Sequence, residues 1–74
     1  MTNKYGALPP PGLEWQVGKT AASISFVYDA EIFLKSCHDT KKTDLLLAAI
    51  QQVKDGSLVF NEWTTPEEYL DKKL

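Results

Sequence analysis

Apolar and polar side chains alternate along three stretches of the chain, residues 13–17, 22–29 and 57–63. A period of two places successive side chains on opposite faces of a β-strand, and the aromatic and β-branched residues in these stretches favour that structure. The segment 18–21 between the first two stretches has the length of a hairpin loop. The pattern therefore predicts an antiparallel hairpin followed, later in the chain, by a third strand.

The second of these stretches also fits a helix. Four side chains recur at the three- and four-residue spacings of a helix face: Phe26, Ala30, Phe33 and Cys37. The density of aromatic and β-branched residues up to Tyr28 favours the strand. On that interpretation Asp29 caps a short helix over 30–37.

A longer helix is predicted where strong helix formers run from Leu45 to Lys54, with apolar residues at helical spacing. Thr43 or Asp44 is the expected N-cap. The helix is expected to end at Asp55-Gly56, because glycine readily adopts the left-handed conformation of a C-terminal cap.

A last helix is predicted over 66–73 from a compact start signal. Thr65 and Glu68 have the spacing of a capping box, and Pro66 between them suits the first helical position. Both Glu67 and Glu68 also suit the positive end of the helix dipole.

These elements predict an α+β domain in the order strand, strand, helix, helix, strand, helix, with a small antiparallel three-stranded sheet and helices packed on one face. The domain spans 13–74. It follows a Pro/Gly-rich arm, 1–12, that is expected to be flexible or packed on the surface; a Pro-rich ligand for an aromatic groove is the weaker alternative. One apolar face per element gives the expected core: Trp15, Val17, Ile24, Phe26, Phe33, Leu46, Ala49, Ile50, Val53, Leu58, Phe60 and Leu70.

Composition narrows the class of partner. The 74 residues suffice for one domain, and a 43% hydrophobic content favours a folded chain. All eight basic residues are Lys and the net charge is −2, so nucleic-acid binding is disfavoured. No apolar run reaches the ~18 residues of a membrane span. A single cysteine, Cys37, points to a cytoplasmic protein rather than a disulfide-bonded secreted one.

Cys37-His38 is the one pair of residues that suggests catalysis. Neighbouring residues on a helix point ~100° apart, which is poor geometry for direct proton transfer, and free cysteines are usually buried. One Cys and one His are also too few for a zinc site within one chain. We therefore expect no catalytic residues, no metal and no cofactor.

Other fragments of known motifs have simpler explanations. Gly18-Lys19-Thr20 has the ending of a phosphate-binding loop, but Leu13 stands where that motif requires glycine. No stretch has the residue pattern of a calcium loop. The carboxylate pairs Asp29/Glu31 and Glu67/Glu68 are explained by helix starts.

The remaining candidates are four large aromatic residues that so small a core cannot bury completely: Trp15, Tyr28, Trp63 and Tyr69. Trp and Tyr are frequent anchors of protein interfaces. The sequence thus favours a protein-binding module, such as an inhibitor, an adaptor or an accessory subunit of the kind that phages encode. A self-associating structural protein, such as a homodimer, is the alternative. A small enzyme that uses Cys37 and His38 ranks third.

Overall fold

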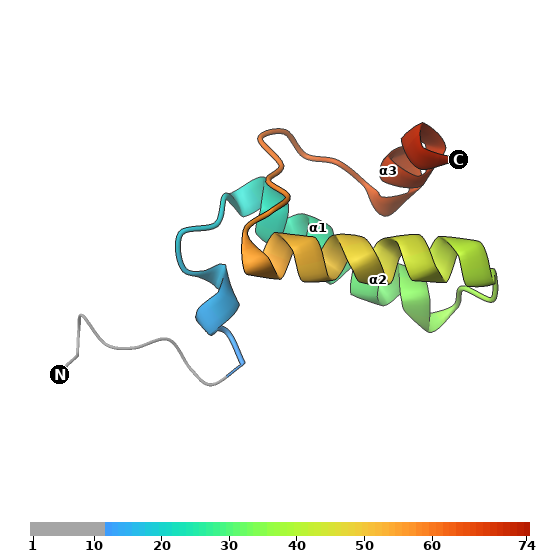
Figure 1. The fold of residues 1–74 in the computed structure, drawn as a ribbon, viewed down its shortest axis with the longest axis horizontal. Coiled ribbons are helices and arrows are strands. Elements are labelled where there is room, and N and C mark those ends of the chain that lie inside the picture. Colours follow the sequence, from blue (N-terminus) through green and yellow to red (C-terminus); the bar gives the residue numbers. More distant parts are fainter. Residues whose placement is uncertain (1–11) are drawn as a thin grey trace, which may run out of the picture.

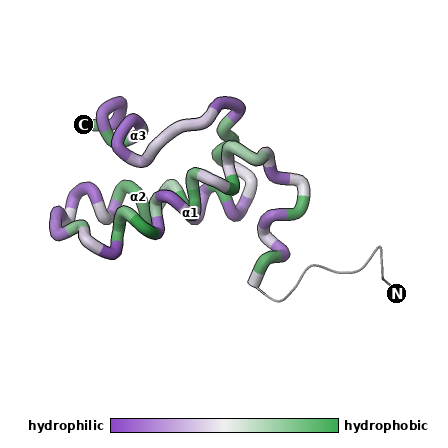
Figure 2. The backbone as a smooth tube through the Cα atoms, turned by 180° about the vertical axis from the view of Figure 1, so that it is seen from behind, coloured by the Kyte–Doolittle hydropathy of each residue, from purple (hydrophilic) through white to green (hydrophobic). Residues whose placement is uncertain are grey.

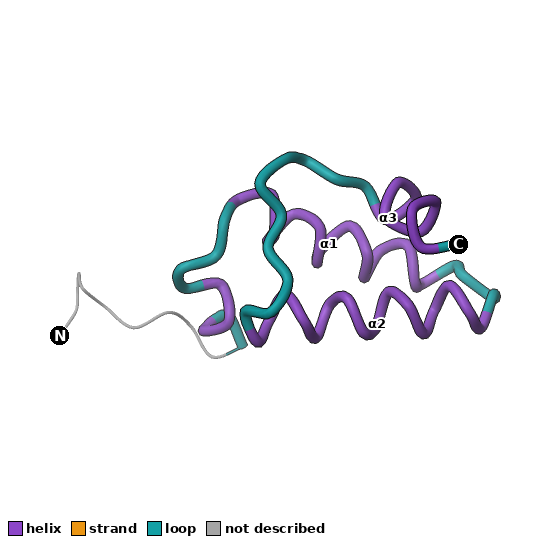
Figure 3. Tube along the Cα trace, turned by 45° about the horizontal axis from the view of Figure 1, so that its top comes forward, coloured by secondary structure: helices purple, strands orange, loops and turns teal. Residues whose placement is uncertain are grey.

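The computed structural model describes residues 12–74, which form three α-helices and one turn of 3-10 helix (Figure 1). Helices α1 and α2 run antiparallel as a hairpin joined by 36–39, and α3 lies across one side of that hairpin (Figure 3). The segment 56–65 returns along the same side to reach α3. The bounds are η1 Glu14–Gln16, α1 Ala21–Lys35, α2 Thr40–Asp55 and α3 Pro66–Lys73.

The predicted α+β fold is wrong, because residues 12–74 contain no strand. The predicted second strand, 22–29, and the predicted helix over 30–37 are largely one continuous helix, α1. This segment has apolar residues at both periods, and packing against α2 selects the helical one. Once 22–29 is helical, the sheet loses its middle member, and the two remaining segments, 13–17 and 57–63, could form at most a two-stranded pair, which is only marginally stable. They form η1 with its flanking turn and an irregular connection.

Side-chain caps define the start of every α-helix. The Thr20 side chain accepts a hydrogen bond from the Ser23 N–H at 3.0 Å, which explains why α1 begins well before Asp29. Asp39 accepts from the Lys42 N–H at 3.1 Å. Helix α2 therefore starts earlier than the predicted Thr43 or Asp44 cap, because an acceptor in the linker satisfies its first N–H groups.

The predicted C-terminal end of α2 and the predicted start of α3 are confirmed. Helix α2 ends at Asp55, and Gly56 has a left-handed backbone with φ of 91°. Thr65 and Glu68 form the capping box in both directions, with Pro66 in the first turn.

The core lies between the two long helices and beneath α3. Hydrophobic residues are concentrated along α1 and α2, whereas α3 is mostly hydrophilic (Figure 2). The fully or nearly fully buried apolar side chains are Ala22, Phe26, Val27, Ala30, Leu46, Ala49, Ile50, Val53 and Leu70. Six of them were predicted. Ala22 and Val27 were missed because the strand pattern placed neither on a core face, and Ala30 was missed because it was predicted at the start of a short helix, outside the core.

Other predicted core residues divide into two groups. Trp15, Phe33, Leu58 and Phe60 are partly buried and pack against the core. Ile24 is half-buried, and Val17 is 65% exposed. The prediction for Val17 is wrong because the chain leaves η1 at this residue instead of continuing as a strand.

Low pH should destabilise the capping box at the start of α3. The Glu68 carboxylate accepts hydrogen bonds from the Thr65 N–H and hydroxyl, and these hold its pKa below the usual range. A carboxyl group with a lowered pKa in the folded state stabilises the fold above its unfolded-state pKa. That contribution is lost as the pH falls through the folded-state value. We expect the melting temperature, followed by circular dichroism, to fall less on acidification for Glu68→Gln than for the natural protein. Gln retains the capping geometry but does not titrate, so an equal fall in both proteins would contradict this role for Glu68.

Candidate functional site

The four predicted anchor residues occupy three different environments. Trp63 is 70% exposed in the connection between α2 and α3. Tyr69 is half-buried, with its ring 5.4 Å from that of Phe26. Trp15 and Tyr28 form a pair with ring centroids 6.2 Å apart. The structure therefore does not gather the four into one site, and Trp63 is the most exposed of them.

The segment that carries Trp63 is anchored before this residue by Phe60. The Phe60 ring stacks on Phe26 with centroids 4.3 Å apart. Its N–H donates to the Ser23 hydroxyl at 2.8 Å, and its carbonyl accepts from the Thr20 hydroxyl. Ser23 is fully buried. The start of α1 thus holds this part of the connection through both backbone and ring.

The same segment is anchored after Trp63 by the start of α3. Pro66 is buried, and Thr65 is held in the capping box with Glu68. The Thr64 hydroxyl also donates to the Glu62 carbonyl at 3.0 Å. Only 61–64 separate the two anchors, so the exposed indole is presented by a short segment that is fixed at both ends.

Trp15 and Tyr28 belong to a second cluster, at the opposite end of the hairpin from the α1–α2 linker. The Gln16 amide donates to the Tyr28 hydroxyl, and the Lys54 ammonium lies 5.5 Å from the centre of the Trp15 ring. These contacts join η1 to α1 and to α2. Trp15 is half-buried, so this cluster fastens η1 to the hairpin while leaving Tyr28 44% exposed.

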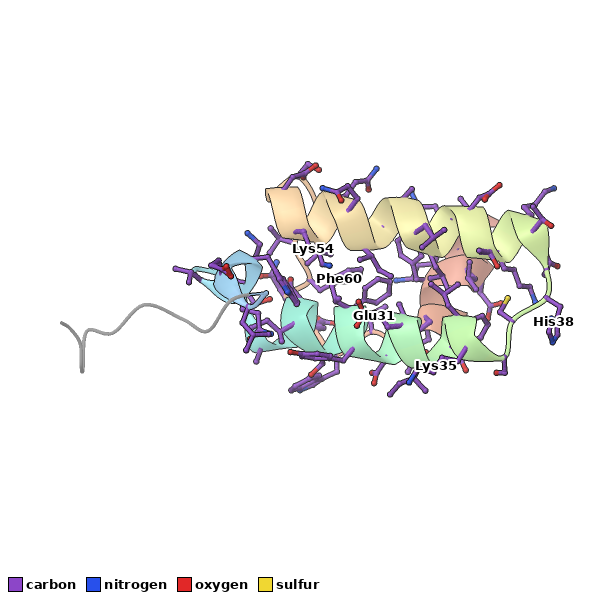
Figure 4. The ribbon with its side chains drawn as sticks, turned by 90° about the horizontal axis from the view of Figure 1, so that it is seen from below. Glu31, Lys35, His38, Lys54 and Phe60 are labelled. Carbon is purple, nitrogen blue, oxygen red and sulfur yellow. The ribbon has the colours of Figure 1, made fainter. Side chains whose placement is uncertain are left out.

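Cys37, predicted as the last residue of a helix, lies in the linker between α1 and α2. His38 lies in the same linker (Figure 4). The half-buried Cys37 thiol contacts the Asp39 carbonyl at 3.8 Å and the Thr43 hydroxyl at 3.7 Å. His38 is exposed. Both of these contacts of the sulfur are to neutral groups, so neither supplies a base that would activate it.

The other sequence fragments have structural roles. Thr20, at the end of Gly18-Lys19-Thr20, caps α1. Glu68 is engaged by Thr65. Asp29 and Glu31 are exposed in the middle of α1, so their predicted explanation as charges at a helix start is wrong. No group of three or more His, Cys, Asp and Glu side chains within 12–74 could hold a metal ion.

The helices of this part of the chain are also too short or too polar to cross a membrane. Residues 1–11, which make up nearly all of the Pro/Gly-rich arm, lie outside the described residues.

No protein-family model, curated protein or solved structure matches the chain. The site is therefore interpreted from its own residues. Sequence reasoning identified Trp63 but missed Thr20 and Ser23, whose hydroxyls hold the Phe60 backbone. A Ser and a Thr just before a run of apolar residues signal a helix start, and that signal could have identified them.

Proposed function

We propose that the protein acts by binding another protein, with the Trp63 side chain as the central anchor. The observation that carries this proposal is a Trp that is 70% exposed on a segment fixed at both ends. Trp is strongly enriched among the residues that dominate binding energy in protein interfaces. A segment whose two ends are already fixed loses little backbone entropy on binding.

The size of the indole supports this role. A Trp side chain can bury about 150–250 Å², and at about 25 cal/mol per Å² covering the exposed part of Trp63 would contribute about 3 kcal/mol. Val59, which is 54% exposed, lies in the same connection. Polar residues beside Trp63 (Asn61 and Glu62, both exposed) supply the hydrophilic rim that surrounds such anchors.

An inhibitor, an adaptor or an accessory subunit is the class of protein that this arrangement fits best. Such a protein covers a site on a larger partner and needs no catalytic residues of its own. The single cysteine supports a reducing compartment such as the cytoplasm as the place of action.

Substitution Trp63→Ala should weaken binding of the partner at least about tenfold, which corresponds to about 1.4 kcal/mol. The tagged full chain would be used to capture proteins from a lysate. The captured proteins would be quantified by mass spectrometry and the affinity remeasured with the purified partner. Circular dichroism should be unchanged, because the indole is mostly outside the core.

Val17→Ala is a matched control, because Val17 is 65% exposed but lies next to η1. It should retain the partner. If no captured protein is depleted by Trp63→Ala relative to Val17→Ala, Trp63 is not the anchor.

A further inference from the structure

The part of the chain that presents Trp63 carries negative charge only. From Gly56 to Asp71 it contains no Lys, whereas the rest of the chain holds all eight Lys and is net positive. Glu62 directly precedes Trp63, and Glu67 follows it by four residues. At about 3.3–3.6 Å per residue, the Cα atoms of Glu67 and Trp63 are at most about 14 Å apart. The carboxylates of this stretch are those of Glu62, Glu67, Glu68 and Asp71.

Most of these carboxylates are available to a partner. Glu62, Glu67 and Asp71 are exposed. On α3 the buried residues are Pro66 and Leu70, while Glu67 and Asp71, four residues apart, share a different side of the helix. The negative charge beside Trp63 therefore continues along the solvent side of α3.

The Lys residues on either side of this stretch do not neutralise its centre. The Lys54 ammonium lies 5.5 Å from the centre of the Trp15 ring, and the Lys73 ammonium lies 5.5 Å from the centre of the Tyr69 ring. Lys72 and Lys73 are in the last turn of α3, whereas Glu67 is in its first turn. The end of α3 that follows Trp63 is thus the acidic end.

The sign of this charge discriminates among the possible partners of Trp63. Nucleic acids and anionic lipid head groups are themselves negative and are bound by basic surfaces. A second copy of the chain would bring the same carboxylates, and like charges that face each other oppose association. A different protein with a basic surface is attracted by them.

We infer that the partner of Trp63 is a different protein with a basic surface, on which Lys or Arg side chains surround an apolar pocket that receives the indole. This inference rests on the proposed function and specifies the chemistry of the partner. Trp63 occupies the centre of the contact, and Glu62 and Glu67 meet basic side chains at its rim. Rim charges act mainly on the rate of association, whereas a central anchor acts mainly on the rate of dissociation.

Reversal of the rim charges tests the inference. The protein whose capture Trp63→Ala depletes would be purified, and its binding to the full chain measured by surface plasmon resonance. The double variant Glu62→Lys with Glu67→Lys should lower the association rate constant at least about tenfold at low salt, because two attractive charges become repulsive. Its dissociation rate constant should change little. Trp63→Ala should instead mainly raise the dissociation rate constant.

Salt provides a second measurement that needs no variant. Association of the natural protein should slow between about 0.05 and 0.5 M salt, because the ions screen the attraction between the two surfaces. Association of the Glu62→Lys, Glu67→Lys variant should not slow over the same range, since no attraction remains to be screened. A rate constant of the natural protein that is independent of salt would overturn the inference.

The double variant Glu31→Lys with Asp44→Lys is the matched control. It changes the net charge by the same amount at exposed residues of α1 and α2, and Glu31 lies on the side of the hairpin away from α3 (Figure 4). It should slow association much less than the rim variant.

Equal effects of the two double variants would overturn the basic partner while leaving Trp63 as the anchor. If Trp63→Ala depletes no captured protein, the proposed function fails and this inference fails with it. Circular dichroism of each variant verifies that its helices are retained.

Discussion

Replacement of Phe26 by Ala should cost about 3–5 kcal/mol in the free energy of unfolding, the usual range for removing a buried aromatic ring. Phe26 is fully buried, and its ring contacts both Phe60 and Tyr69. It therefore joins α1, the connection after α2, and α3. The substitution leaves a cavity and removes both aromatic contacts.

This loss is a large share of the total free energy of unfolding because the domain is small. At about 0.05–0.15 kcal/mol per residue, a chain of 74 residues has a stability of about 4–11 kcal/mol. The Phe26→Ala variant should therefore lose a large share of this stability, and at the lower end of the range it would be partly unfolded in the absence of denaturant. Urea denaturation followed by circular dichroism measures the change.

Phe26→Leu is the control for this prediction, because it retains most of the apolar volume and should cost less. A loss below about 1 kcal/mol for Phe26→Ala would contradict the central place of this ring, since buried aromatic residues rarely cost so little.

Replacement of Ser23 by Ala should cost about 1–3 kcal/mol, the penalty for leaving a buried polar group without a partner. The Ser23 hydroxyl accepts the hydrogen bond from the Phe60 N–H at 2.8 Å and contacts the Thr20 hydroxyl at 2.8 Å. Without it the Phe60 N–H loses its side-chain acceptor, whereas the Phe60 carbonyl keeps its bond from Thr20. Urea denaturation again gives the change in unfolding free energy.

Ser23→Ala should also weaken partner binding through Trp63, because the same hydrogen bond fixes one end of the segment that presents the indole. Ser25→Ala is the matched control: Ser25 is half-buried on the same helix, and none of the contacts to Phe60 involve it. If the two variants have the same stability, the Ser23 hydroxyl does not hold the connection.

The end of α2 and the start of α3 were predicted correctly because the signals there are local, whereas the strand predicted over 57–63 is wrong. Gly56 ends α2, and Thr65 with Pro66 starts α3, each through contacts within a few residues. The prediction for the first half was wrong because the apolar residues of 22–29 fit both the two-residue period of a strand and the spacing of a helix. The choice between the two depends on α2, which lies later in the chain. Val27 and Ala30 were missed for the same reason.

The exposed Trp63 could be named from the sequence as one of four candidates, but not singled out. What distinguishes it is the position of Phe60, which contacts Ser23 across 37 residues of chain. Tyr69 is held among the core aromatic rings and Trp15 is held by Tyr28 and Lys54. The members of each of these pairs are separated in sequence, and only the fold brings them together.

The contrast between the two Trp residues has a spectroscopic consequence. Trp63 faces water, whereas Trp15 is half-buried beside an aromatic ring and an ammonium group. The chain therefore carries two intrinsic fluorophores that report on different surfaces. If a partner docks on Trp63 as proposed, Trp63 emission should change on binding, whereas Trp15 emission should report on the attachment of η1 to the end of the hairpin away from the α1–α2 linker. One fluorescence titration without an added label would then follow both surfaces.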